Sequence, residues 1–314
     1  MQTLEALSRR MSTLESIHSV VRTMKTLSAV NAAPYESAAA SIDRFHETVL
    51  RGLQIVLRSI DAPRRPGETA AALQIALVFG SDHGLCGGYN EAVAAAALAD
   101  TSLRGVTFFA VGARMAATLE GLGVIVAQQF TPPASADGVG RLAGEVLIAL
   151  DEARAQMAGG DIAVATVHMR RGASGAHAPE RSQLLPVASE FLDELRVRPW
   201  SSRCLPTFRM APDALFGALI RHHLFASLFR AAAEAMAAEN AARLALMQQA
   251  ERAIDDRLTE LRAAHRAARQ SEITNELLDV IAGSEALNRA RLRRKLSTSK
   301  RAKLDWAAPT TTST

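Results

Sequence analysis

One glycine-rich loop holds the residues of this chain that are best suited to chemistry. It runs from Gly80 to Asn90 and contains Asp82, His83 and Cys86 in that order. An acid, an imidazole and a thiol are the groups of a nucleophilic site, and a turn between a strand and a helix is where phosphate groups bind. Two chemistries therefore compete with a purely structural role for this loop.

The spacing within the loop favours the structural role. The loop lacks the Lys and Ser/Thr of a P-loop, and its glycines do not follow the GxGxxG pattern of dinucleotide-binding turns. Residues adjacent in one loop seldom reach the geometry of a nucleophile and its base. A nucleotide-binding α/β enzyme remains an alternative on this loop alone. The sequence predicts a tight turn that needs positive φ angles, made of Gly84, Leu85, Cys86, Gly87 and Gly88.

The remaining reactive side chains do not form a recognisable site. His222 and His223 lie in a helical stretch without a His or carboxylate partner four residues on, which favours helix-surface or seam histidines over a metal site. Cys86 and Cys204 are two isolated thiols, too few for a disulfide framework or a metal cluster, and they fit a reducing, cytoplasmic setting. We therefore expect no catalytic residue, no cofactor and no metal.

Charge is concentrated at the C-terminal end. The chain carries a net charge of +4, yet residues 288–314 alone hold eight basic residues and one acid. Such a tail could bind nucleic acid or an anionic membrane. No aromatic residue interleaves with its charges before Trp306, which favours a solvated or partner-contacting tail. With no run of 18 apolar residues and no signal peptide, we expect membrane contact only through partners.

Both ends of the chain predict long helices. Between Ala218 and Ala282 there is no Gly or Pro over 65 residues, which at 1.5 Å per residue gives a rod about 100 Å long. Its seam includes Ile254, Leu258, Leu261, His265 and Ala268. A similar N-terminal stripe consists of Leu4, Leu7, Met11, Leu14, Ile17, Val21 and Met24.

Pro34 interrupts the N-terminal stripe, so this helix either bends near Ala33 or consists of two helices. Neither terminal seam has a short-range partner. We therefore expect the two terminal helices to pack on each other as an antiparallel coiled coil.

The middle of the chain alternates strands and helices, which predicts βαβ units and a mainly parallel sheet. We expect strands at 73–79, 106–111, 124–127 and 162–168, and helices at 91–100, 113–122 and 139–157. Residues 170–182 read as a loop or mobile hairpin, and residues 183–187 as an edge strand.

The predicted fold class is α/β plus long α: an antiparallel coiled coil with an inserted Rossmann-like α/β domain. Residues 1–60 form the N-terminal coiled-coil helix, and residues 68–208 form the α/β foot domain. The C-terminal coiled-coil helix covers residues 212–287, with Gly283 as a stop signal. Residues 288–314 form a basic tail that we expect to be disordered.

Four motifs that are separated along the chain all resemble the same protein family. Residues 267–283 read AARQSEITNELLDVIAG, residues 81–90 read SDHGLCGGYN and residues 239–247 read ENAARLALM. A weaker motif, VVRTMKTL, occupies residues 20–27. The motifs occur in the order, and with nearly the spacing, found in the γ subunit of F-type ATP synthases, the central rotor shaft. The chain therefore resembles this family over residues 1 to about 287.

This resemblance implies a chain that does no chemistry itself. Its coiled coil would stand inside the α3β3 hexamer, and its α/β foot would meet the ε subunit and the c-ring. Met24 and Arg243 would lie near the lower bearing of the shaft. The resemblance further implies a peripheral protein on the cytoplasmic face of the bacterial plasma membrane. The residues that would face the catch region of the β subunits are Arg269, Gln270, Thr274 and Glu276.

The sequence also departs from the family pattern. Pro34 stands where a straight helix is expected, His83 replaces an Arg of the loop motif, and the tail from Asn288 is extra. These departures suggest a divergent or alternate γ subunit, such as that of a sodium-type F-ATPase, although this chain does not set the choice of ion. The competing class is a coiled-coil scaffold whose basic tail binds nucleic acid. It explains the rod and the tail but not the ordered motifs, so we expect no direct nucleic-acid binding.

Overall fold

A computed structural model gives the fold of this chain, and two compact units make it up. One unit combines Met1–Val20 with Glu251–Thr314, and the other is Val21–Ala250. For residues 292–305 only the backbone is described. The structure describes residues 3–60, 73–99, 105–156, 162–171, 177–200, 202–204 and 206–305.

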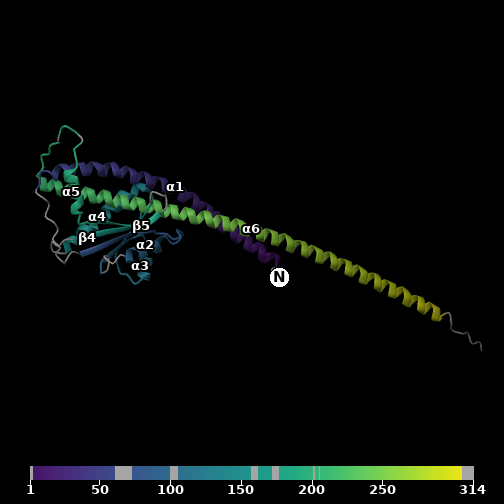
Figure 1. Cartoon of the computed structure of the whole chain (residues 1–314). Coiled ribbons are helices and arrows are strands. Elements are labelled where there is room, and N and C mark those ends of the chain that lie inside the picture. The colour runs from purple at the N-terminus through teal and green to yellow at the C-terminus, as the bar shows by residue number, and fades with distance from the viewer. Residues whose placement is uncertain are drawn as a thin grey trace, which may run out of the picture. The chain divides into compact units, whose positions relative to one another are not determined.

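Two long helices contribute to both units (Figure 1). Helix α1 spans Leu4–Val56 and passes through Pro34 without interruption, so it is one helix and not two. Pro34 lies on the exposed side of α1, where water can bond the carbonyl group that proline leaves without a donor. The next residue, Tyr35, is buried and donates its hydroxyl to the Pro133 carbonyl at 2.9 Å, which anchors this stretch of α1.

Helix α6 is longer than its sequence predicted. It spans Pro212–Asp305 and continues through Gly283, so Gly283 does not stop it. Residues 288–305 are helical, and the expectation of a disordered segment is wrong for them; residues 306–314 lie outside the described part of the chain. One exposed glycine costs a helix only about 1 kcal/mol, and the good helix formers that follow Gly283 are enough to carry the helix past it.

The first unit is an antiparallel pair of helix segments. His18 of α1 lies 3.2 Å from Asp255 of α6, and Glu15, one turn earlier on α1, pairs at 3.0 Å with Arg262, two turns later on α6. Leu7, Leu258 and Leu261, all positions of the predicted seams, are buried.

The same antiparallel pairing occurs within the second unit. Asp43 pairs with Arg230 at 3.2 Å, and His46 bonds His223 at 2.8 Å. Farther along α1, a Cβ on Gly52 would meet the Leu219 side chain at 3.0 Å, so the helices approach closely there. The predicted antiparallel arrangement is therefore confirmed within each unit.

A five-stranded sheet forms the centre of the second unit, with strand order β3-β2-β1-β4-β5. Strands β1 to β4 are parallel to one another, and the edge strand β5 pairs antiparallel with β4. The predicted Rossmann-like alternation is thus confirmed. The strands are β1 (Leu73–Phe79), β2 (Thr107–Val111), β3 (Val126–Phe130), β4 (Ile162–Arg171) and β5 (His177–Leu185).

Helices cover both faces of this sheet (Figure 1). Alternate residues of β1 belong to two apolar cores, one with each set of helices. Leu77 packs toward α4 and α6, and Val78 packs toward α2 and α3. A third apolar cluster joins α1, α5 and the start of α6 around Leu53 and Leu195. The helices are α2 (Tyr89–Ala99), α3 (Ala113–Gly121), α4 (Val139–Gln156) and α5 (Ser189–Val197), with a short 3-10 turn at Ala136–Gly138.

Two local predictions need correction. Of the two alternatives for residues 170–182, the hairpin is confirmed and the loop is wrong in the described part, because β4 runs to Arg171 and pairs antiparallel with β5 from His177. Their polar composition hid the strands: Arg170 and Glu180 form an ion pair across the hairpin at 2.8 Å, so polar side chains stabilise this edge. Helix α5 was not predicted from the sequence.

Candidate functional site

The glycine-rich loop after β1 is held by its own side chains. The Ser81 amide donates to Asn90 Oδ1 at 2.9 Å, and Asn90 Nδ2 donates to Ser81 Oγ at 2.8 Å. Asp82 Oδ1 accepts from the amide of Ala113 at 3.0 Å and so caps the start of α3. One backbone amide of the loop is therefore already bonded within the chain.

The backbone of this loop contains the positive φ angles that its sequence predicted. Gly87 has φ +64°, and Leu85 has φ +65°, which is rare for a residue with a side chain. Gly84 and Gly88 flank them, but their φ angles lie outside the left-handed region. The start of the loop also packs closely against Gly112. A Cβ at this position would come within 2.4 Å of the Ser81 carbonyl oxygen.

Cys86 is not placed as a nucleophile. Its side chain is buried, and its thiol donates to Ser81 Oγ at 3.5 Å. Burial raises the pKa of the Cys86 thiol, so the reactive thiolate is disfavoured at neutral pH. His83 is exposed and lies 3.8 Å from Asp82 rather than beside the thiol. The acid, imidazole and thiol of the sequence motif therefore form no catalytic arrangement.

Helix α6 fixes the loop from outside. Tyr89 donates its hydroxyl to the Ala235 carbonyl at 3.0 Å, and Arg243 donates to the His83 carbonyl at 3.4 Å. Arg243 also forms an ion pair with Glu239, and both side chains are largely buried. Burial raises the pKa of Glu239, and the Arg243 guanidinium opposes that shift. The guanidinium of Arg243 is thus engaged within the chain.

The other predicted contact residues lie in two different units. Met24, like Arg243, belongs to the second unit, and it is half-buried on α1. Four belong to the first unit, where they are exposed on α6: Arg269, Gln270, Thr274 and Glu276. The hydroxyl of Thr274 donates to the Gln270 carbonyl one turn earlier at 2.8 Å.

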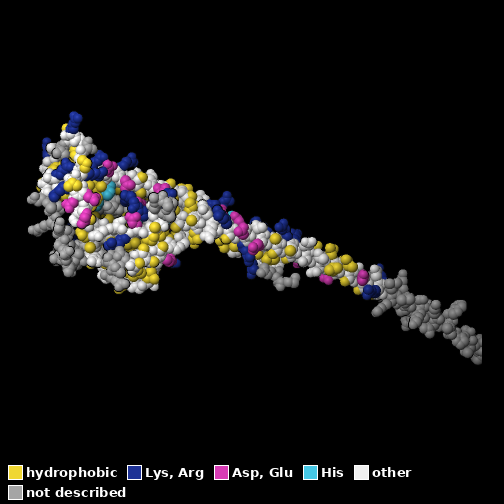
Figure 2. Space-filling view, in the orientation of Figure 1, with side chains coloured by type: hydrophobic (Ala, Val, Ile, Leu, Met, Phe, Trp, Pro, Cys, Tyr) yellow, Lys and Arg dark blue, Asp and Glu magenta, His cyan; other side chains and the backbone are white. Residues whose placement is uncertain are grey.

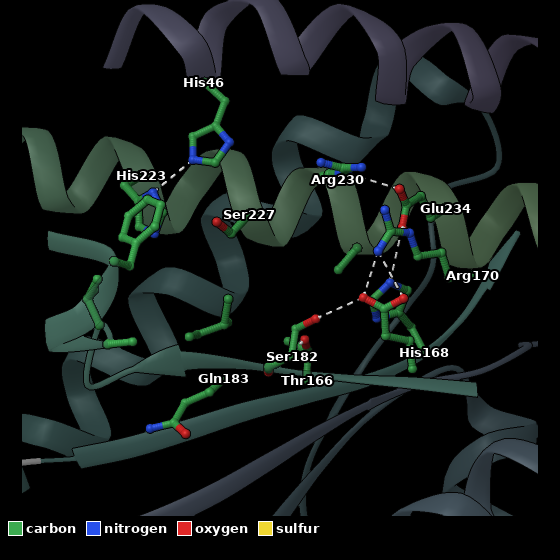
Figure 3. A pocket seen from close by; sticks show the side chains of 16 residues that line it. His46, Thr166, His168, Arg170, Ser182, Gln183, His223, Ser227, Arg230 and Glu234 are labelled. Carbon is green, nitrogen blue, oxygen red and sulfur yellow. Dashed lines mark hydrogen bonds and ion pairs between the residues drawn. The ribbon is translucent and has the colours of Figure 1, made fainter. Parts of the chain in front are cut away.

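A polar pocket of about 350 Å³ in the second unit was not predicted from the sequence (Figure 3). It lies between β4, β5, α1, α5 and α6. At one end His46 bonds His223, whose ring lies 5.6 Å from that of Phe191. Burial, together with the neighbouring His46, lowers the pKa of His223 to about 4. His223 therefore has a partner, but one that lies on the other long helix.

At the other end of the pocket, charged residues of three elements meet. Glu234 of α6 accepts from His168 of β4 at 3.2 Å and from Arg230 at 2.9 Å (Figure 3). Arg170 of β4 donates to both carboxylate oxygens of Glu180 on β5, at 2.8 and 2.9 Å. The one sequence signal that pointed here was the single acid of the run AAAEAMAA at residues 231–238.

Among the residues that the structure describes, no group of three or more His, Cys, Asp or Glu side chains could hold a metal ion. None of the described helices is long and apolar enough to cross a membrane.

Comparison with known sequences places nearly the whole chain in one family. The sequence model of the family described as ATP synthase matches residues 3–287. The chain is 26% identical over 298 residues to the ATP synthase gamma chain of Lachnoclostridium phytofermentans, covering 92% of this chain and 100% of that one. It is 25% identical over 301 residues to the ATP synthase gamma chain of Granulibacter bethesdensis, covering 91% and 100%.

Comparison with solved structures supports the same fold. A chain of the Euglena gracilis mitochondrial ATP synthase rotor aligns with a TM-score of 0.58 at 14% identity, over 86% of this chain and 98% of that chain. A chain of the OSCP/F1/c-ring structure from the same organism aligns with a TM-score of 0.63 at 16% identity, over 92% and 95%. The long terminal helices and the inserted sheet are common to both alignments.

Proposed function

The chain belongs to the ATP synthase gamma-chain family, and from this premise we propose that its two long helices are the shaft of a rotary F1Fo ATP synthase. The chain is a non-catalytic subunit, and the catalytic sites belong to the β subunits around it. An asymmetric shaft presents a different face to each of three β subunits. Rotation then shifts which β conformation is most stable, and with it the affinity for nucleotide.

The observation that carries this proposal is the unpartnered apolar surface of α6. Six large apolar residues between 273 and 287 are exposed on α6, a part of the helix where hydrophobic side chains outnumber charged ones (Figure 2). A helix that exposes so many apolar side chains needs a surrounding partner to bury them. The α3β3 hexamer is such a partner. The exposed residues are Ile273, Leu277, Leu278, Val280, Ile281 and Leu287.

The predicted contact residues have distinct parts in this proposal. Met24 and Arg243 lie near the lower bearing of the shaft, where Arg243 also holds the loop of residues 84–88 by its bond to His83. This loop has a structural part, because it connects β1 to α2 and the residues on either side of it bond to α6. The residues that face the catch region of the β subunits are Arg269, Gln270, Thr274 and Glu276.

The inserted α/β domain is the foot of the shaft. We assign residues 68–208 to it, residues 1–60 and 212–287 to the coiled coil, and the basic residues 288–314 to a separate tail. The foot meets the ε subunit and the c-ring, so the chain reaches the membrane only through partners, at the cytoplasmic face of a bacterial plasma membrane. The transported ion, proton or sodium, is a property of the c-ring.

A rotation assay tests the proposed function. Cys204 is exposed and Cys86 is buried, so a maleimide-linked bead can be attached at Cys204 in a Cys86→Ser background. With the α3β3 hexamer fixed to a surface, we expect the bead to turn in one direction when ATP is added and to stop when it is removed. A chain that does not copurify with α and β, or that binds DNA in a salt-sensitive manner instead, would support the scaffold alternative.

A charge reversal tests the contact residues. Glu276→Lys places a cation on an exposed position of α6 without disturbing a buried group. We expect a folded, assembled enzyme with impaired coupling between ATP hydrolysis and ion pumping. The matched control is Glu120→Lys on exposed α3, which makes the same charge change in the foot. Wild-type ATP-driven pumping by the Glu276→Lys enzyme would refute the contact assignment.

A further inference from the structure

Over residues 231–238, the buried surface of α6 is made mainly of alanine. Six alanines between residues 231 and 238 are buried, and they belong to the cores that contain β1 and β4. A methyl group forms only a shallow ridge, and apolar contact has no preferred direction. Such a surface packs α6 against the sheet, but over these residues it gives less resistance to sliding than larger side chains would. The buried alanines are Ala231, Ala232, Ala233, Ala235, Ala237 and Ala238.

Glu234 is the one charged residue within this alanine surface. Its side chain is 18% exposed, and its two oxygens are shared between two elements. Oε2 accepts from His168 Nε2 of β4 at 3.2 Å, and Oε1 accepts from Arg230 Nε of α6 at 2.9 Å (Figure 3). His168 is itself buried within the sheet. A hydrogen bond of this kind weakens steeply when its angle changes, so it resists displacement in a defined direction.

The bonds of Glu234 continue into a chain of charged groups. Arg230 NH1 reaches Asp43 of α1 at 3.2 Å, so α1 is tied to the same carboxylate through one guanidinium. Arg170 of β4 places its Nε 3.8 Å from Glu234 and donates through NH1 to Glu180 of β5. Four elements are therefore joined through Glu234, and two of them are the long helices.

The hydrogen bonds that Glu234 accepts also keep its carboxyl group ionised. Burial would raise its pKa, yet the hydrogen bonds from His168 and Arg230 lower the pKa of Glu234 to about 2. The carboxylate is charged at neutral pH, and the directional bonds are present under working conditions.

We propose that Glu234 is a positioning residue that fixes the α/β domain against rotation about the two long helices, so that torque passes between foot and shaft through its bonds. This inference rests on the proposed shaft function. The buried alanines of α6 pack against the sheet, and the chain of charged groups prevents α6 from sliding along it. Glu234 touches no substrate, and it acts on coupling only through His168, Arg230 and Arg170.

The test compares loaded and unloaded turnover of the whole enzyme in sealed membrane vesicles. Glu234→Gln keeps the side-chain shape but removes the charge that strengthens both bonds. A membrane-potential dye follows pumping of either ion, and ATP hydrolysis is followed in uncoupled vesicles. We expect hydrolysis without a potential to stay near the wild-type rate, while the pumping-to-hydrolysis ratio against a potential falls by about threefold or more.

Two control variants separate positioning from stability. Glu145→Gln removes an exposed ion pair with Arg141 that lies within α4 alone, so it crosses no interface. Leu228→Ala removes a buried apolar side chain of α6 from the same core and lowers thermal stability without touching the charged groups. We expect both controls to keep the wild-type ratio.

Each outcome decides the inference. A wild-type ratio in Glu234→Gln overturns it. So does an equal fall in Leu228→Ala at equal loss of thermal stability, because the effect would then be structural. An equal fall in Glu145→Gln also overturns it. Failure of the shaft function itself would look different, because the wild-type chain would then neither assemble with α and β nor support pumping.

Discussion

The His46–His223 pair predicts that acid destabilises the second unit well above the pH at which carboxylates titrate. The two rings bond at 2.8 Å between α1 and α6, with Phe191 against His223. Burial disfavours the charged imidazolium, so the folded chain binds a proton at His223 only near pH 4. In the unfolded chain the same ring binds a proton near pH 6.5.

The size of the effect follows from linkage. A histidine whose folded pKa is lowered contributes stability that is present above the unfolded pKa and is lost as pH falls toward the folded pKa. With values of 6.5 and about 4, lowering the pH from 7 to 5 removes about 2 kcal/mol of folding free energy at His223. Burial also lowers the pKa of His46, which adds to the loss in the same direction. The carboxylate of Glu234, with a pKa of about 2, stays ionised in the folded chain throughout this range.

Urea unfolding of the chain at pH 7 and pH 5 measures this quantity. The variant His223→Gln keeps a hydrogen-bonding side chain toward His46 but does not titrate. We expect the wild-type chain to lose about 2 kcal/mol more than this variant between the two pH values. The control is His222→Gln, an exposed histidine at the adjacent position, which should lose as much as the wild type. Equal pH dependence in wild type and His223→Gln would refute the reasoning.

Four further changes have definite expected outcomes. Tyr35→Phe removes the bond to the Pro133 carbonyl and should cost about 1 kcal/mol in urea unfolding; an unchanged midpoint would count against that anchor. Gly112→Ala forces a Cβ to within 2.4 Å of the Ser81 carbonyl oxygen at φ +100° and should cost about 2 kcal/mol or more in the same assay. Gly283→Ala, where nothing lies near the added Cβ, should slow amide exchange nearby by an amount equal to about 1 kcal/mol, and faster exchange would contradict a continuous helix. Deletion of residues 288–314 should leave assembly with α and β unchanged in gel filtration, because the family match ends at residue 287.

Much of the architecture could be predicted because its signals are local. The absence of Gly and Pro between Ala218 and Ala282 predicted a long helix, and alternating apolar runs predicted the strands of a parallel sheet. The loop of residues 84–88 was predicted as structural because its spacing matched neither a P-loop nor a dinucleotide turn. Each of these inferences depends on residues within a few turns of one another.

The end of α6 was predicted wrongly because that prediction also relied on a local signal. Gly283 is a common stop signal, but a stop signal is only a preference of about 1 kcal/mol. The helix formers on both sides of Gly283 outweigh that preference, so the helix continues to Asp305. A local signal fails where two local signals compete.

The sequence by itself determined the two long helices and most strands of the parallel sheet, because the periodicity of apolar residues is a property of neighbouring positions. It could not determine that His223 faces His46, 177 positions away, or that Glu234 receives bonds from β4 while Arg230 reaches α1. Nor could it place Arg243 against the loop. These contacts depend on the register between the two long helices and on where the sheet lies against them, and only packing of the whole chain sets both.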